Sequence, residues 1–255
     1  MLFRSPMQTK NYNKMYNLLS IIIVFYLIFS ASFWWSTKKQ IFNSPSIVFN
    51  GTKIFNNKHY FDFVNNKNTT DNDLIGIKEY EQILLEHPFI HVFRTSNRYP
   101  DQIIIDIKER EPFAIVNKDP LVFLDKNCYV MPYTENSKHF NVPILSKFNT
   151  APELYPEGKK TLSMKVIDTI SWLKLLHKNY PKLYKEISEI TLSNEDEINL
   201  ILDNQAMKVM LGNKDTLEKL KILQRFKELV IEKNKITDIA YLDIRYKNQI
   251  IVKEN

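Results

Sequence analysis

The segment Met15–Thr37, with the sequence MYNLLSIIIVFYLIFSASFWWST, carries no charged side chain and decides how the chain is organised. A helix of this length, rising about 1.5 Å per residue, spans roughly 33 Å, which matches the hydrocarbon thickness of a bilayer. Trp34 and Trp35 lie near its end, and tryptophan is enriched where transmembrane helices meet the membrane surface. The sequence therefore predicts a single transmembrane helix over residues 15–37.

A cleaved signal peptide is the alternative, because Ser30-Ala31-Ser32 offers the small residues that signal peptidase accepts. Cleavage after Ser32 would leave the apolar residues Phe33, Trp34 and Trp35 at the new terminus, so an uncleaved anchor is favoured. Residues 1–14 contain three basic residues and no acidic one. Because Lys38 and Lys39 follow the helix, the positive-inside rule favours a cytoplasmic N-terminus only mildly. The shortness of this tail favours the same orientation, with the residues after the helix exported.

Composition limits what the exported part is. The chain has 255 residues, of which 44% are hydrophobic and 25% charged, so it is long enough for one large or two small globular domains after the helix. The single cysteine, Cys128, excludes a disulfide framework. The net charge of +6 comes from scattered lysines, which form either a solvated surface or a surface that faces a membrane or an acidic partner. Nucleic acid is a poor match for an exported domain.

Residues 43–112 predict a small domain with the order strand, helix, helix, strand, strand. The strands are expected at 46–50, 89–95 and 102–108. The first helix is expected at 57–65, and the second is capped by Asp73, continues through Leu74 and ends at Pro88. Ile103, Ile105 and Ile107 alternate with polar residues and mark the buried face of the last strand. Two helices should therefore cover one face of a three-stranded sheet.

Residues 113–255 predict a larger, β-rich mixed domain. Strands are expected at 113–117, 121–124, 129–133, 187–192, 198–202 and 207–211, the last three as a meander. One amphipathic helix carries Leu162, Val166, Ile170, Leu173 and Leu176 until Tyr180-Pro181 ends it, and another runs from Leu217 to Val230. Residues 239–252 are expected to form one long strand or a bent pair at the edge of the sheet.

Four motifs in this order resemble the FtsQ/DivIB family of bacterial cell division proteins. They are His87-Pro88-Phe89-Ile90, the turn Tyr99-Pro100-Asp101, the strand end Glu109-Arg110-Glu111-Pro112-Phe113-Ala114, and the terminal segment Tyr241–Val252 with Asp243-Ile244-Arg245-Tyr246. The resemblance implies that residues 43–112 are a POTRA-like domain and residues 113–255 the family's β domain. Cys128 and Lys147 stand where the family usually has glycine; Asn127 is expected to supply the positive φ of the first of these turns.

The resemblance implies a non-enzymatic, bitopic scaffold of the bacterial divisome. Such a protein lies in the cell inner membrane at the septum, with its N-terminus in the cytoplasm and its C-terminal domains in the periplasm. It links early and late division proteins, and it binds an FtsB/FtsL-type pair through its C-terminal strand. A strand at a sheet edge leaves backbone N–H and C=O groups free, which a partner's strand completes by β-augmentation. Neither a cofactor nor a small-molecule substrate is implied.

The partner-binding residues expected on that strand are Arg245, Tyr246 and Asn248. Arginine offers a planar fork that binds a carboxylate, and tyrosine offers a large contact area with a polar tip. Other roles stay open: Arg245 could pair with Asp243 or Glu189 inside the domain, and Tyr246 could be a core residue.

No catalytic or metal-binding constellation is found in the sequence. His87 and His91 have the spacing of a helical zinc pair, but Pro88 between them breaks the helix that would align them. Cys128 has no evident base near it in sequence, and the acids Glu109 and Glu111 are interpreted as solvated charge. Two other functions remain as alternatives: a membrane-anchored envelope hydrolase with an unrecognised site, and a POTRA-type chaperone or secretion component.

Overall fold

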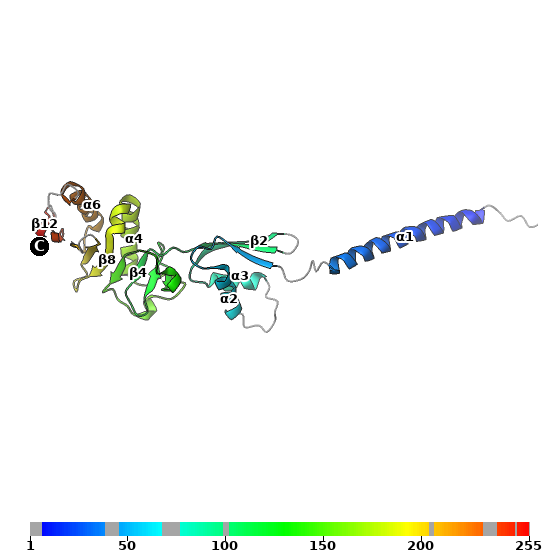
Figure 1. Ribbon diagram of the computed structural model, residues 1–255, viewed down its shortest axis with the longest axis horizontal. Coiled ribbons are helices and arrows are strands. Elements are labelled where there is room, and N and C mark those ends of the chain that lie inside the picture. Colours follow the sequence, from blue (N-terminus) through cyan, green and yellow to red (C-terminus); the bar gives the residue numbers. More distant parts are fainter. Residues whose placement is uncertain are drawn as a thin grey trace, which may run out of the picture. The chain divides into compact units, whose positions relative to one another are not determined.

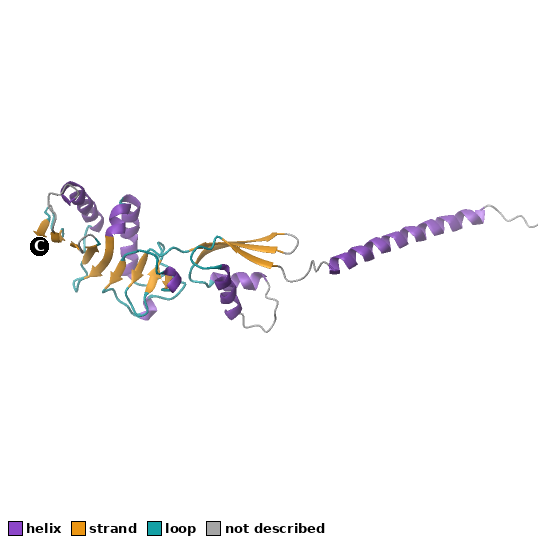
Figure 2. Ribbon diagram, viewed as in Figure 1, coloured by secondary structure: helices purple, strands orange, loops and turns teal. Residues whose placement is uncertain are grey.

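The computed structural model describes residues 7–38, 46–67, 77–98, 102–203, 207–231, 239–247 and 249–254. By contact the chain divides into two units, residues 1–50 with 94–106 and residues 51–93 with 107–255. Figures 1 and 2 show the helices and strands of both units along the sequence. The domain boundary expected at 112/113 stays a prediction.

The first unit begins with the helix α1 (Met7–Lys38). Within it, Met15–Trp35 is long and apolar enough to cross a membrane, with a mean hydropathy of 2.1, and its most apolar stretch is not buried inside the protein. By length and composition this is the helix that the uncharged segment predicts. The same unit holds β1 (Ser46–Asn50), which runs parallel to β3 (Gln102–Glu109), with Ser46 opposite Gln102.

The order strand, helix, helix, strand, strand is confirmed. After β1 come α2 (Asn57–Lys67), α3 (Ile77–Leu85), β2 (Ile90–Arg98) and β3, and the three strands form a sheet in the order β1-β3-β2. The isoleucines 103, 105 and 107 of β3 are buried while their neighbours are more exposed, as the alternation predicts. The expected cap at Asp73-Leu74 and the turn Tyr99-Pro100-Asp101 lie outside the described residues.

Glu109, interpreted as solvated from its sequence, is buried instead. It is 8% exposed at the end of β3, where its carboxylate accepts hydrogen bonds from the backbone N–H groups of residues 53, 54 and 55 at 2.7, 2.7 and 3.2 Å. The hydroxyl of Tyr60 on α2 donates to the same carboxylate at 2.5 Å. A buried carboxylate is tolerated because these four donors replace its water shell.

The second sheet has nine strands in the order β12-β11-β10-β9-β8-β7-β4-β5-β6 (Figure 2). The strands β8, β9 and β10 form the predicted antiparallel meander. Residues 239–252, expected as one long strand or a bent pair, form the pair β11 and β12, and β12 lies at the edge of the sheet. The strand bounds are β4 (Ala114–Val116), β5 (Val122–Leu124), β6 (Val130–Pro132), β7 (Ile144–Ser146), β8 (Ile187–Leu192), β9 (Ile198–Leu202), β10 (Met207–Gly212), β11 (Ile239–Asp243) and β12 (Ile251–Glu254).

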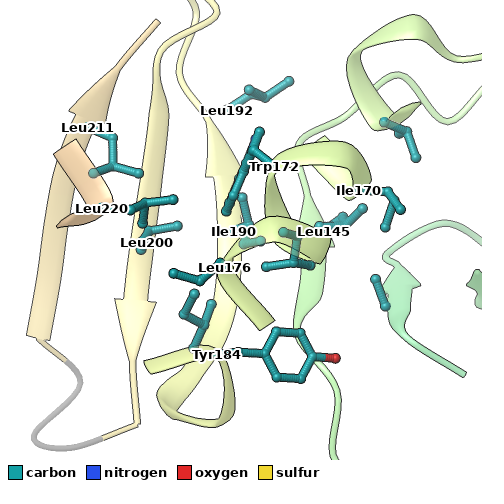
Figure 3. Packing of buried hydrophobic residues seen from close by; sticks show 14 of the residues in the cluster. Leu145, Ile170, Trp172, Leu176, Tyr184, Ile190, Leu192, Leu200, Leu211 and Leu220 are labelled. Atoms are coloured by element: carbon teal, nitrogen blue, oxygen red, sulfur yellow. The ribbon is translucent and has the colours of Figure 1, made fainter. Parts of the chain in front are cut away.

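Two helices connect parallel strands and lie on one face of this sheet (Figure 1). The helix α4 (Met164–Asn179) joins β7 to β8, and α6 (Thr216–Phe226) joins β10 to β11. Crossover connections of the same handedness place their helices on the same side of a sheet when each connection moves to the next strand in the same direction. Their buried side chains meet those of the strands in one core (Figure 3), which includes Leu145, Ile170, Leu173, Leu176, Ile190, Leu200, Leu211, Leu220 and Leu223.

The helix predicted after residue 160 and the observed helix α4 differ at both ends. Leu162, expected in the apolar stripe, precedes α4 and is 62% exposed. Pro181 ends α4 as expected but also begins a further short helix, α5 (Pro181–Glu186), because proline's fixed φ suits the first position of a helix. The remaining short helices are η1 (Glu135–Ser137), η2 (Pro152–Leu154) and the π-helical turn η4 (Lys227–Ile231).

Both positions where the family usually has glycine keep a left-handed backbone. Cys128 has φ 66° and Lys147 has φ 62°. The expectation that Asn127 would supply the positive φ is wrong, because the turn after β5 places the left-handed residue one position later. The fold therefore keeps the backbone shape that glycine permits, at a conformational cost that glycine would not carry.

Candidate partner-binding edge

The sheet ends at the antiparallel pair β11 and β12, which the last part of the chain supplies. Leu242 lies opposite Val252 and Asp243 opposite Ile251. On its other side β11 runs parallel to β10, with Val209 opposite Leu242. β11 is therefore an interior strand, whereas β12 has one strand neighbour in the described part of the chain.

The two faces of β12 differ in environment. Val252 packs against the core of the sheet, while Ile251 and Lys253, on the opposite face, are exposed. Glu254 is exposed at the end of the strand. Because neighbouring N–H groups of a strand point in opposite directions, alternate backbone groups of β12 face away from β11. The strand thus has one anchored side chain, an exposed surface and, in the described part of the chain, no second strand paired along its outer side.

Asp243 ends β11 and shapes the connection to β12. Its Oδ1 accepts a hydrogen bond from the backbone N–H of Arg245 at 3.0 Å, which turns the chain out of the strand in the way that aspartate commonly does. The carboxylate is 4% exposed. Arg245 and Tyr246, expected on a strand, therefore lie in the connection between two strands.

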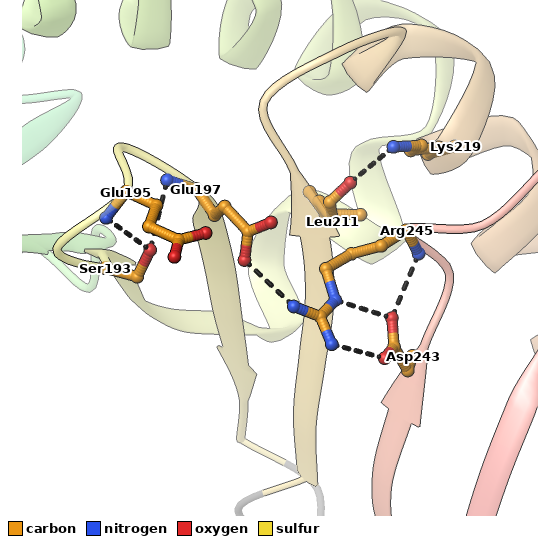
Figure 4. Close-up of polar contacts among 7 residues, drawn as sticks. All are labelled: Ser193, Glu195, Glu197, Leu211, Lys219, Asp243 and Arg245. Atoms are coloured by element: carbon orange, nitrogen blue, oxygen red, sulfur yellow. Dashed lines mark hydrogen bonds and ion pairs between the residues drawn. The ribbon is translucent and has the colours of Figure 1, made fainter.

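Asp243 also holds the side chain of Arg245 in a bidentate pair (Figure 4). The Arg245 Nε atom donates to Asp243 Oδ1 at 3.0 Å, and Nη2 donates to Oδ2 at 2.8 Å. The third nitrogen, Nη1, donates to Glu197 Oε2 at 3.0 Å, beside the start of β9. All three guanidinium nitrogens thus have partners within the domain, and the side chain stays 32% exposed.

The pKa values of this pair move in opposite directions. Hydrogen bonds from Arg245 lower the pKa of the Asp243 carboxyl below its usual value, although burial acts against this. Hydrogen bonds to Asp243 and Glu197 raise the pKa of Arg245. Both groups therefore stay charged at neutral pH, and the connection is held by a charge-assisted pair.

Gly212 leaves room for the Arg245 side chain. Its backbone has φ 77°, and a Cβ atom there would lie 3.3 Å from Arg245 Cγ and 3.4 Å from Lys219 Nζ. Lys219 in turn donates to the carbonyl of Leu211 at 2.7 Å (Figure 4). A side chain at position 212 would strain the turn and displace the arginine.

Tyr246 and Asn248, the other two expected site residues, have different outcomes. Tyr246 is 51% exposed, so it is not a core residue, and the Arg245 guanidinium lies 5.7 Å from the centre of its ring. Asn248 lies outside the described residues. Of the two partners within the domain considered for Arg245, Asp243 pairs with it, whereas Glu197 occupies the role considered for Glu189.

The fold and the edge define a class: an α+β protein with an N-terminal apolar helix, a three-stranded and a nine-stranded sheet, and an edge strand near its end. Comparison with known families matches residues 114–245, just over half of the chain, to the family described as cell division protein FtsQ/DivIB, C-terminal. The chain belongs to the FtsQ/DivIB family of cell division proteins.

Curated relatives agree with this assignment. The chain is 27% identical over 169 residues to the cell division protein FtsQ of Syntrophotalea carbinolica, and 29% identical over 174 residues to that of Geotalea daltonii. It is 24% identical over 181 residues to that of Geobacter sp. strain M21. The alignments cover 66, 66 and 71% of this chain and 58, 60 and 64% of these relatives. The chain thus matches about three fifths of their length.

No three histidine, cysteine or acidic side chains gather as metal ligands among the residues that the structure describes. The edge presents the outer side of β12, the exposed ring of Tyr246 and the partly exposed side chain of Arg245.

Proposed function

We propose that this protein is a non-enzymatic scaffold of the bacterial division machinery that captures an FtsB/FtsL-type pair by β-augmentation along β12. The observation that carries the proposal is the position of β12 at the end of the nine-stranded sheet. A partner strand added there gains main-chain hydrogen bonds without displacing any described strand.

The connection before β12 gives this edge its specificity in our proposal. Tyr246, 51% exposed, supplies the direct side-chain contact, since tyrosine offers large contact area at low entropic cost. Arg245 acts mainly as a positioning residue, because Asp243 and Glu197 bind its nitrogens. Its exposed part lies at the rim of the proposed contact. Asn248, which lies outside the described residues, stays the third proposed contact residue.

The location proposed for the protein follows from α1. The span Met15–Trp35 anchors the chain in the inner membrane, and the basic residues before it keep the N-terminus in the cytoplasm. The remaining residues then lie in the periplasm, where they link early and late division proteins at the septum.

A capture experiment tests the edge. The full chain, embedded in lipid nanodiscs, is immobilised and exposed to a purified FtsB/FtsL-type pair. Tyr246→Ala should weaken capture about tenfold, as the loss of an interface anchor does. Leu217→Ala is the matched control, because Leu217 is a 40% exposed apolar residue on α6 rather than at the edge.

Two results would reject the proposed edge. The first is that the Tyr246→Ala variant and a variant lacking residues 251–255 both capture the pair as well as the unchanged chain does. The other is equal loss from Leu217→Ala, which would place the contact elsewhere or make it non-specific. A fluorescent fusion in cells depleted of the native protein tests the location: the proposal requires a septal band and filamentous cells on depletion.

A further inference from the structure

A basic hollow lies at the far end of the nine-stranded sheet from β12. It has a volume of about 420 Å³ and is lined by lysines from three places in the fold. Lys126 lies in the turn between β5 and β6, Lys160 precedes α4, and Lys174 lies on α4. All three side chains are exposed, and no carboxylate lines the hollow.

None of these three lysines forms an ion pair with a described residue. Asp125, the buried acid that precedes Lys126 in the chain, pairs with Arg110 at 2.8 Å and accepts hydrogen bonds from the backbone N–H groups of Asn127 and Tyr129. Burial raises the pKa of the Cys128 thiol, which lines the hollow, so this group is neutral at pH 7. The smaller hollow therefore has no carboxylate in its own lining that compensates its three lysines.

The wall of the hollow is fixed. Tyr129 has the guanidinium of Arg110 at 3.7 Å from its ring centre and the ammonium of Lys160 at 5.7 Å. Because Asp125 holds Arg110, the tyrosine ring keeps its position beside the lysines. Ser171 and Asn127 add a hydroxyl and an amide to the lining.

A larger hollow of about 730 Å³ adjoins it and shares His91, Lys126 and Asn127 with it. Its lining adds the apolar side chains of Ile54, Ile107 and Phe140, three further basic side chains and three acids, Glu109, Glu111 and Asp125. Glu109 and Asp125 are buried and accept hydrogen bonds within the protein, whereas Glu111 is exposed. The two hollows together are much larger than a single phosphate and offer apolar contacts beside positive charge. A ligand that fills both needs carboxylates at one end and apolar side chains along its length.

We propose that these adjoining hollows bind an acidic peptide segment of a second partner protein, with its carboxylates at Lys126, Lys160 and Lys174. The site is independent of the edge-strand function, because β5 and β6 lie at the opposite end of the sheet order from β12. An extended acidic segment fits because charge complementarity places its carboxylates and the apolar lining receives the side chains between them.

A labelled peptide that alternates glutamate and leucine is the probe. Its binding to the full chain in phosphatidylcholine nanodiscs is followed by fluorescence anisotropy at physiological ionic strength. The triple variant Lys126→Gln, Lys160→Gln and Lys174→Gln should raise Kd about tenfold or more, since each partly exposed pair contributes modestly and three act together. The single variants should each raise Kd about two- to threefold.

The matched control removes the same charge elsewhere. Lys182, Lys214 and Lys221 are also exposed, and none lines either hollow, so their combined replacement by glutamine should change Kd less than about twofold. Equal weakening by both triple variants would overturn the site, as would the lack of saturable binding. Displacement of the peptide by inorganic phosphate at equal charge concentration would also overturn it, because the hollow would then be a phosphate site. Failure of this test leaves capture at β12 unaffected.

Discussion

His59 and His87 face each other with their Nε2 atoms 3.2 Å apart. His87 is buried, and its Nδ1 accepts a hydrogen bond from the backbone N–H of Phe89 at 3.3 Å. Its proton is therefore on Nε2, which donates to the Nε2 atom of His59. Both rings are neutral in this arrangement, and Phe55 stacks on His59 with ring centres 4.1 Å apart.

This pair predicts acid sensitivity. Burial, the adjacent His59 and Lys67 lower the pKa of His87 to about 3, and burial lowers that of His59 against the opposing charges of Asp62 and Glu109. A depressed pKa means that the unfolded state binds more protons below about pH 6.5, so stability falls as the pH drops from there. The lowered pKa of His87 alone should decrease the free energy of unfolding by about 3 kcal/mol between pH 7 and pH 4.

Urea unfolding of the full chain in detergent, followed by circular dichroism across this pH range, measures the effect. His87→Gln should unfold more easily at pH 7 but show a flatter pH dependence. His139→Gln, at an exposed histidine, should keep the unchanged slope. An equally steep slope in His87→Gln would assign the acid sensitivity to other groups.

Glu109 predicts a second stability effect. Replacement by glutamine turns one acceptor oxygen into a donor that faces Tyr60 or a backbone N–H, so Glu109→Gln should lower the free energy of unfolding by about 2 kcal/mol. Tyr60→Phe removes one donor and should cost about 1 kcal/mol. Because the two side chains are hydrogen bonded, the double variant should lose less than the sum. Additive losses in urea unfolding would mean that this bond contributes no coupling.

Most predicted elements were correct where a periodic pattern indicated burial, although Leu162, assigned to the apolar stripe of a helix, precedes α4 and is exposed. The alternation that identified Ile103, Ile105 and Ile107 continues in step to Glu109, so this signal could have placed the carboxylate on the buried face. It was missed because a charged residue at the end of a strand is more often solvated. The aspartate two residues before Arg245 was likewise a visible signal for their pairing.

Glu197 could not be found in the same way. Glu197 contacts Arg245 from 48 residues away in the sequence. The contact depends on the strand order β9, β10 and β11, in which β10 is antiparallel to β9 and parallel to β11. Strand order is set by packing of the whole sheet rather than by local pattern. For the same reason the sequence did not reveal that three lysines from separate loops and α4 line one hollow.

Lys147 predicts a stabilising substitution. Its side chain is exposed and its φ is 62°, a conformation that costs a residue with Cβ about 1–2 kcal/mol. Lys147→Gly removes this strain but raises the entropy of the unfolded chain. The free energy of unfolding, measured with urea, should therefore increase by about 0.5–1 kcal/mol. Lys159→Gly, at an exposed loop position without positive φ, should instead destabilise. A loss at both positions would show that the left-handed backbone is not a source of strain at 147.

Asp243 predicts coupling between stability and partner capture. Asp243→Asn removes the charge that binds Arg245 in a bidentate pair. This substitution should lower the free energy of unfolding by about 1–2 kcal/mol. If Arg245 is a positioning residue, Arg245→Ala and Asp243→Asn should weaken capture of an FtsB/FtsL-type pair to a similar extent, and the double variant should add little. Independent, additive losses would instead indicate that Arg245 contacts the partner directly.

The position of β12 at the end of the described sheet predicts a difference between two neighbouring proline substitutions. Val252 lies opposite Leu242 and Lys253 opposite Tyr241, so one of their two N–H groups points to β11 and the other away from it. Proline removes an N–H donor. One of Val252→Pro and Lys253→Pro should therefore unfold more easily, whereas the other should keep its unfolding midpoint and lose about tenfold in partner capture. Val252→Ala and Lys253→Ala measure the side-chain contributions separately. If the stable proline variant captures the pair as well as its alanine counterpart does, the outward backbone of β12 does not bind the partner.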